Sequence, residues 1–195
     1  TLEIFRKTDN TFFDVTLTRR MIDVQNIRYK MLTDKTGYVH IKGFINGVND
    51  DFRSAMDDLQ AQGARDVIFD LRYNSGGSAS VMLDMLEYLL PEDTLISTIK
   101  GREQGKEYSV EWKTEAGMSV PEGMRYMILV NSYSASASEL FSGALRDNGK
   151  AVIIGETTFG KGSGTSTYKL SDGSAVNVTI FQYYLPGGDS VEGTG

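Results

Sequence analysis

The sequence predicts an α/β fold, and three observations support this prediction. Short apolar runs typical of buried strands alternate along the chain with segments of helical periodicity. Turns rich in glycine or small residues follow two of these runs directly. The chain has 195 residues, of which 40% are hydrophobic and only 3 are proline, so it can bury one sizeable core. We therefore expect one α/β core with a small additional segment.

The N-terminal part of the chain has all-β character. Alternation of apolar and polar residues predicts strands over residues 2–6 and 12–18, around a turn at Thr8-Asp9-Asn10. A connection follows, and the next strand is expected over residues 37–45. We expect a boundary between the all-β segment and the core near residues 29–34.

The core is expected to continue as alternating helices and strands. Asn49 is a suitable N-cap for the first predicted helix, Gly63 ends that helix, and Pro91 ends the second. Asp172-Gly173 predicts a hairpin turn. The expected elements are helices over 50–62, 78–90 and 136–148, and strands over 67–71, 94–98, 108–112, 125–130, 152–154, 165–170 and 175–184.

Composition excludes several classes of function. A net charge of −6 argues against a nucleic-acid partner, which would need clustered lysine and arginine. With no cysteine, the chain has no thiol nucleophile, thiolate metal ligand or disulfide. Its single histidine, His40, lies in a strand-like run and belongs to no metal-binding motif, so we expect neither a metal nor a cofactor. No apolar run approaches the roughly 18 residues of a membrane span.

A cluster of serines follows the predicted strand 125–130. The segment Ser134-Ala135-Ser136-Ala137-Ser138-Glu139 leads from that strand into a helix. Such a turn presents a nucleophile at a helix N-terminus, where backbone N–H groups favour a developing oxyanion. A capping box formed by Ser136 and Glu139 explains the same residues without any chemistry. Ser134 and Ser138 are rival nucleophiles.

The segment Gly155–Gly162 contains the candidate base. It nearly matches a phosphate-binding loop, but Gly162 replaces the hydroxyl residue and no helix follows, so we reject that interpretation. A serine needs a base to become a nucleophile, and a neutral lysine can serve. Because the only histidine is distant in sequence, Lys161 is the leading candidate, although most lysines are simply solvated.

A third turn, Asp70–Gly77, ends in two glycines between a predicted strand and helix. Glycine lets backbone N–H groups converge on a ligand oxygen, which suits an oxyanion hole. A plain turn between strand and helix uses glycine equally well.

Together these motifs resemble the C-terminal processing (tail-specific) serine protease family, from about Met31 to the last residue. They occur in the family's order, and the set comprises Gly37-Tyr38-Val39-His40-Ile41, Asp70-Leu71-Arg72-Tyr73-Asn74-Ser75-Gly76-Gly77, the serine cluster and Gly155–Gly162. The resemblance implies a crotonase-like (ClpP-like) α/β core of β-β-α units. It also implies that Ser136 is the nucleophile and Lys161 the general base.

The resemblance assigns further roles. The Ala137 N–H and the Gly76-Gly77 turn would form the oxyanion hole, and Asp147 would support the site. Thr165 stands where the family commonly has a glutamine bonded to the lysine, and threonine is shorter but can still accept a hydrogen bond.

The resemblance also implies a domain organisation and a function. Residues 1–30 would be the C-terminal remnant of a PDZ domain with a linker, and residues 31–195 a serine protease core truncated at its C-terminus. The implied enzyme is a bacterial, extracytoplasmic endopeptidase of the cell envelope that acts through an acyl-enzyme. Its partners would be polypeptides with exposed C-terminal tails, and a homo-oligomer is compatible with it. Two alternatives stay open: a non-catalytic ligand- or peptide-binding module on the same core, and acyl-CoA chemistry.

Overall fold

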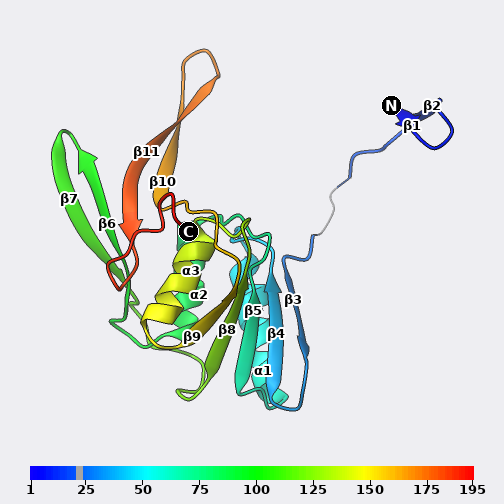
Figure 1. Cartoon of the computed structure of the whole chain (residues 1–195). Coiled ribbons are helices and arrows are strands. Elements are labelled where there is room, and N and C mark those ends of the chain that lie inside the picture. The colour runs from blue at the N-terminus through cyan, green and yellow to red at the C-terminus, as the bar shows by residue number, and fades with distance from the viewer. Residues whose placement is uncertain (21–23) are drawn as a thin grey trace.

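The computed structural model describes residues 1–20 and 24–195, which form three sheets and three helices (Figure 1). The helices are α1 (Val48–Ala61), α2 (Ala79–Leu89) and α3 (Ala137–Asp147). The strands are β1 (Leu2–Arg6), β2 (Thr11–Val15), β3 (Ile27–Met31), β4 (Thr36–Ile41), β5 (Asp66–Asp70), β6 (Leu95–Glu103), β7 (Lys106–Lys113), β8 (Arg125–Val130), β9 (Ala151–Gly155), β10 (Ser163–Lys169) and β11 (Ala175–Tyr184). The predicted α/β class is confirmed.

A five-stranded sheet in the order β3-β4-β5-β8-β9 carries the core. Strands β4, β5, β8 and β9 are parallel, and β3 is antiparallel to β4 at the edge. Alternate residues such as Val67 and Phe69 are buried on one face because helices cover it, whereas Ile68 and Met127 lie on the other, less covered face. The carboxyl ends of β5, β8 and β9 therefore lead into neighbouring loops, and these loops carry the motifs found in the sequence.

Aromatic side chains join the helices to this sheet. Phe69 of β5 lies 5.9 Å from Phe52 of α1, 5.2 Å from Tyr126 of β8 and 5.6 Å from Phe141 of α3, measured between ring centroids. These distances are in the favourable range for tilted and edge-to-face pairs. The position of α3, and hence of the residues at its N-terminus, is fixed by this packing.

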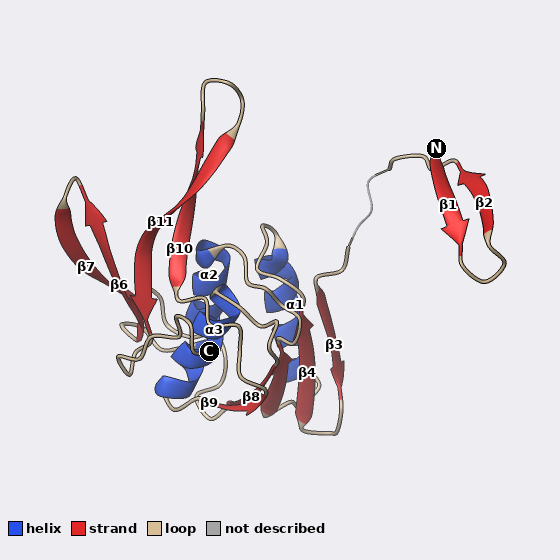
Figure 2. Cartoon of the chain, turned by 45° about the horizontal axis from the view of Figure 1, so that its top comes forward, coloured by secondary structure: helices blue, strands red, loops and turns tan. Residues whose placement is uncertain are grey.

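A four-stranded antiparallel sheet in the order β10-β11-β6-β7 lies beside the core. Figures 1 and 2 show α2 and α3 between the five-stranded sheet and two hairpins, β6–β7 and β10–β11, which diverge toward their tips. The hairpins are joined only near their base, where Phe181 to Tyr184 of β11 pair with Thr98 to Gly101 of β6. This pairing places the C-terminal end of β11 next to the core.

A strand of the core sheet spans the predicted N-terminal boundary. Residues 27–31 form β3, which pairs with β4 from Ile27↔Ile41 to Met31↔Gly37, so the core sheet begins before residue 31. Exposed Arg28 and Lys30 give this edge strand the polar appearance of a connection. The predicted hairpin 2–6/12–18 is confirmed as β1 and β2, which pair with each other. Residues 21–23, in the predicted linker, lie outside the described residues.

In the part of the chain that the structure describes, no helix is both long enough and apolar enough to span a membrane.

Candidate active site

Ser136 occupies a sharp turn between β8 and α3. Its backbone has φ 57° and ψ −116°, a combination that side-chain-bearing residues rarely adopt because Cβ meets the backbone. Such a conformation costs on the order of 1–3 kcal/mol and persists only where the surrounding structure imposes it, most often at functional sites. The next residue, Ala137, begins α3, so the turn presents Ser136 at a helix N-terminus.

The two rival serines are structural. Ser134 Oγ donates to the Leu71 carbonyl oxygen at 2.8 Å and accepts from the Asn131 N–H at 3.0 Å. Ser138 Oγ donates to the Asn74 carbonyl oxygen at 2.8 Å. Both residues are completely buried, whereas Ser136 is half-buried. Of the three hydroxyls, the geometry leaves Ser136 as the candidate nucleophile.

One cavity of about 470 Å³ brings together most of the residues predicted from the sequence. Its lining includes Gly77, Ser136, Ala137, Lys161 and Thr165. The other lining residues are Ser78, Ala79, Met82, Trp112, Leu140, Ser163, Gly164, Phe181 and Tyr183. Within the described residues, no hydrogen bond joins Lys161 Nζ to Ser136 Oγ. The structure thus places both residues at one cavity, and catalytic hydrogen bonds often tighten only when substrate binds.

Glu139 ties the serine turn to the lysine loop. Its carboxylate is buried and accepts the Ser136 N–H at 2.7 Å and the Lys161 N–H at 2.9 Å on the same oxygen, Oε2. The other oxygen, Oε1, accepts the Thr158 hydroxyl and the Gly160 N–H, each at 2.7 Å. The capping box predicted from sequence is present. The Glu139 carboxylate also positions the backbone of Lys161, the candidate base, and this long-range role was not predicted from the sequence.

The lysine loop is held on its other side by the C-terminal segment. Glu192 Oε2 accepts the Gly162 N–H at 2.7 Å, and the Gly193 N–H donates to the Gly160 carbonyl oxygen at 2.8 Å. The Tyr183 N–H of β11 donates to the Gly162 carbonyl oxygen at 2.9 Å. The backbone around Lys161 is therefore fixed from α3, from β11 and from residues 192–193.

The candidate oxyanion hole has fewer available N–H donors than the sequence predicts. The Gly76 N–H already donates to Asn74 Oδ1 at 2.9 Å. The Gly77 and Ala137 N–H groups have no protein acceptor in residues 1–20 and 24–195, and both residues line the cavity. Gly76 serves by its small size instead, because an added Cβ would lie 2.7 Å from the Ala135 carbonyl oxygen and 3.0 Å from Ser136 Cβ. Gly77 and Ala137 remain the two available donors.

The Asp70–Gly77 turn is anchored by a buried carboxylate. Asp70 is 3% exposed and accepts from the Arg72 N–H at 3.0 Å, Arg72 Nε at 2.9 Å, Arg72 Nη2 at 2.6 Å and the Tyr38 hydroxyl at 2.7 Å. Burial alone raises the pKa of a carboxyl, but the hydrogen bonds from Arg72 and Tyr38 outweigh burial and hold the pKa of Asp70 below its usual value. The ionised form of Asp70 is thus the one that stabilises the turn.

Replacing Asp70 with asparagine removes the charge that pairs with Arg72 and is expected to lower the free energy of unfolding at pH 7 by about 1–2 kcal/mol. The loss is no larger because Arg72 is half-exposed and water screens part of the ion pair. A lowered pKa in the folded state adds stability above the unfolded-state value of about 3.9, and this stability is lost as pH falls below it. The stability gap between wild type and Asp70→Asn should therefore shrink in urea titrations at about pH 3.5. A gap that is equal at both pH values would contradict this account.

Asp147 and His40 lie away from the cavity. Asp147 is at the C-terminal end of α3, where it accepts from Arg146 Nε at 2.7 Å and from the Gly187 N–H at 3.0 Å. Any support that Asp147 gives to the site passes through α3 and the loop around Gly187. His40 is half-buried in β4, opposite Asp70 in the register.

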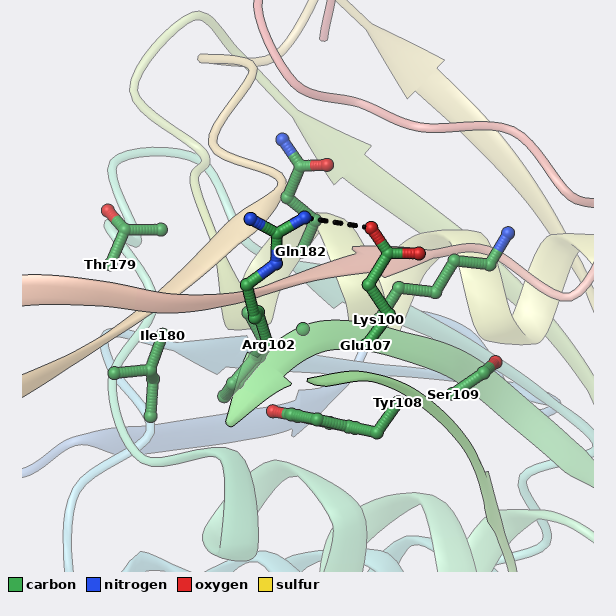
Figure 3. Close-up of a pocket in the computed structure, with 10 residues that line it drawn as sticks. Lys100, Arg102, Glu107, Tyr108, Ser109, Thr179, Ile180 and Gln182 are labelled. Carbon is green, nitrogen blue, oxygen red and sulfur yellow. Dashed lines mark hydrogen bonds and ion pairs between the residues drawn. The ribbon is translucent and has the colours of Figure 1, made fainter. Parts of the chain in front are cut away.

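A second hollow lies apart from the candidate catalytic residues. It measures about 650 Å³ and lies where the two hairpins diverge (Figure 3). Its charged side chains include Arg102, which donates to Glu107 at 3.0 Å in a solvated ion pair. None of the candidate catalytic residues lines this hollow.

Comparisons with known proteins point to one family. A family model described as peptidase family S41 matches residues 35–195. The chain is 35% identical over 177 residues to a carboxyl-terminal-processing protease of Synechocystis sp., covering 89% of this chain and 40% of that protein. It is 30% identical over 189 residues to carboxyl-terminal-processing peptidase 2, chloroplastic, of Arabidopsis thaliana, covering 93% of this chain and 36% of that protein. The chain thus spans less than half the length of these relatives.

Solved structures show the same fold. A photosystem II D1 C-terminal processing protease superposes with a TM-score of 0.74 at 26% identity, over 95% of this chain and 50% of the other. An S41 protease of Bacteroides fragilis superposes with a TM-score of 0.72 at 21% identity, over 99% of this chain and 56% of the other. At this identity, the second likeness bears on the fold alone.

Proposed function

The chain belongs to peptidase family S41, and on that premise we propose that it forms the catalytic core of a serine endopeptidase that cleaves polypeptides near their C-termini. The family match and the names of the relatives support hydrolysis of peptide bonds. The observation that carries the proposal is the strained turn at Ser136, which opens onto the same cavity as Lys161.

The proposed reaction uses Ser136 and Lys161 as a dyad. The neutral amine of Lys161 takes the hydroxyl proton as Ser136 Oγ attacks the carbonyl carbon of the scissile bond. The resulting oxyanion lies against the N–H groups of Gly77 and Ala137. When the C–N bond breaks, Lys161 returns the proton to the leaving amine, and water then hydrolyses the acyl-enzyme. Removing one oxyanion donor typically raises the barrier by about 2.7–4 kcal/mol.

The substrate class follows from the cavity and from the relatives' names. Met82, Trp112, Leu140 and Phe181 give the cavity apolar walls next to the polar Ser136, as in sites that bind an apolar side chain beside the reacting bond. Two relatives are named for processing at carboxyl termini, which supports substrates with exposed C-terminal tails.

The organisation around this core is also part of the proposal. We assign residues 1–26, which include the β1–β2 hairpin, to the end of a PDZ domain and its linker. Residues 27–30 belong to strand β3 of the core sheet instead. The PDZ domain would capture substrate tails by strand addition. The core is assigned the crotonase-like fold. The whole protein is placed outside the cytoplasm, in a bacterial cell envelope, and a homo-oligomer is compatible with this assignment. These assignments rest on the family resemblance.

A serine-reactive probe tests the proposed function directly. A fluorophosphonate should label the purified protein at Ser136, identified by peptide mass spectrometry, and the labelled protein should no longer cleave peptides. Lys161→Met should slow labelling by about 10²-fold or more, because the hydroxyl loses its base. Labelling of another residue, or an equal rate in Lys161→Met, would contradict the dyad. No labelling and no peptide cleavage would favour a non-catalytic binding module, and binding of acyl thioesters would favour acyl-CoA chemistry.

A further inference from the structure

The hydroxyl of Tyr183 lies between the backbones of the two proposed catalytic residues. It is hydrogen-bonded to the Ser136 carbonyl oxygen at 3.1 Å and closely to the Lys161 carbonyl oxygen. Carbonyl oxygens only accept, so the Tyr183 hydroxyl is the donor, and its single proton is shared between them. Two segments that are distant in sequence thus meet at one side chain of β11.

Tyr183 is itself firmly placed. The residue is 4% exposed, its N–H donates to the Gly162 carbonyl oxygen at 2.9 Å, and β11 pairs it with Ile99 of β6. Burial, reinforced by the negative charges of Glu139 and Glu192, raises the pKa of Tyr183. The hydroxyl therefore keeps its proton, and so its role as a donor, at neutral pH.

Tyr183 complements Glu139. The carboxylate of Glu139 accepts the N–H groups of Ser136 and Lys161, and the hydroxyl of Tyr183 serves the carbonyl oxygens of the same two residues. One side chain comes from α3 and the other from β11. In both Ser136 and Lys161, the N–H donates to Glu139 and the carbonyl oxygen accepts from Tyr183.

We propose that Tyr183 is a positioning residue that sets the separation of Ser136 and Lys161 through their carbonyl groups; this inference rests on the dyad proposed above. Without the hydroxyl, the Lys161 carbonyl oxygen loses its donor, whereas the Ser136 carbonyl oxygen keeps the N–H groups of Glu139 and Leu140, so the lysine loop can move relative to the serine turn. A displacement of about 1 Å in such a site can cost about 10²-fold in rate. Substrate binding depends less on this separation, so the loss should fall mainly on kcat.

The test compares Tyr183→Phe with Tyr126→Phe. Tyr126 is a matched control because its hydroxyl is also buried but has no hydrogen-bond partner among the described residues, and it lies in β8 away from the cavity. Tyr183→Phe should lower kcat for peptide cleavage by about 10- to 100-fold and change KM by no more than about 3-fold. Tyr126→Phe should leave both parameters near wild type. A kcat within about 2-fold of the control would overturn the proposal.

Amide hydrogen exchange separates this inference from the proposed function. In Tyr183→Phe, the segments around Ser136 and Lys161 should exchange about 10-fold faster than in Tyr126→Phe, because their common anchor is gone. If the wild-type protein cleaves no peptide and reacts with no fluorophosphonate, the proposed function fails, and exchange still tests the anchor. Equal exchange in the two variants would overturn the role of Tyr183 whatever the activity.

Discussion

Replacing Ser136 with alanine is expected to reduce peptide cleavage by about 10⁴-fold or more while leaving the fold intact. The hydroxyl is the proposed nucleophile, and its loss removes the covalent route entirely. Alanine has the same Cβ, so it fits the turn with φ 57° no worse than serine. The free energy of unfolding should fall by about 1 kcal/mol or less, the typical cost of losing an N-cap hydroxyl. Cleavage assays and urea unfolding on the same preparation check both parts.

Its neighbours provide matched controls within the same motif. Ser134→Ala and Ser138→Ala each remove a buried hydroxyl that donates to a backbone carbonyl. Each should lower the free energy of unfolding by about 1–2 kcal/mol and retain cleavage. Abolished cleavage in either variant at wild-type stability, together with activity in Ser136→Ala, would reassign the nucleophile.

Replacing Glu139 with glutamine is expected to damage both stability and activity. Four donors converge on its carboxylate: three backbone N–H groups and the Thr158 hydroxyl. A glutamine keeps the shape but offers one acceptor oxygen, and its NH₂ group faces donors whichever way it is turned. We expect the free energy of unfolding to fall by about 3 kcal/mol. We expect kcat/KM to fall by about 10²–10³-fold, because the Ser136 turn and the Lys161 loop lose their common acceptor.

Glu156→Gln is the control for this prediction. Glu156 is exposed and accepts only the Ser132 N–H, at 3.2 Å, among the described residues. The same change of charge there should leave stability and activity close to wild type. Wild-type behaviour of Glu139→Gln in both assays would show that the two loops hold their positions without the carboxylate.

Local patterns in the sequence predict the helices and the parallel strands well, because each buries one face with its own periodicity. The helix that begins at Ala137 and the strand Asp66–Asp70 are examples. The edge strand Ile27–Met31 was missed because edge strands face solvent and carry charges such as Arg28 and Lys30. Its pairing with β4 joins residues that lie 6 to 14 positions apart, which local alternation cannot reveal.

The candidate site, too, is predicted only in part from local sequence. The motifs identify Ser136, Lys161, Gly77 and Ala137, and all four line one cavity. Local sequence explains Glu139 only as the partner of Ser136 in a capping box. Its contacts with residues 158–161 arise from the packing of α3 against the following loop. The sharing of the Tyr183 hydroxyl by two distant backbones likewise exists only once β11 has joined β6.

The positive φ of Ser136 brings the stability of the fold and the proposed catalytic role into conflict at one position. Glycine, which adopts positive φ at no steric cost, is the residue that this turn favours, yet glycine carries no reactive group. Serine at this position therefore carries a steric cost of about 1 kcal/mol or more that glycine would avoid, and the proposed role of Ser136 as nucleophile accounts for that cost.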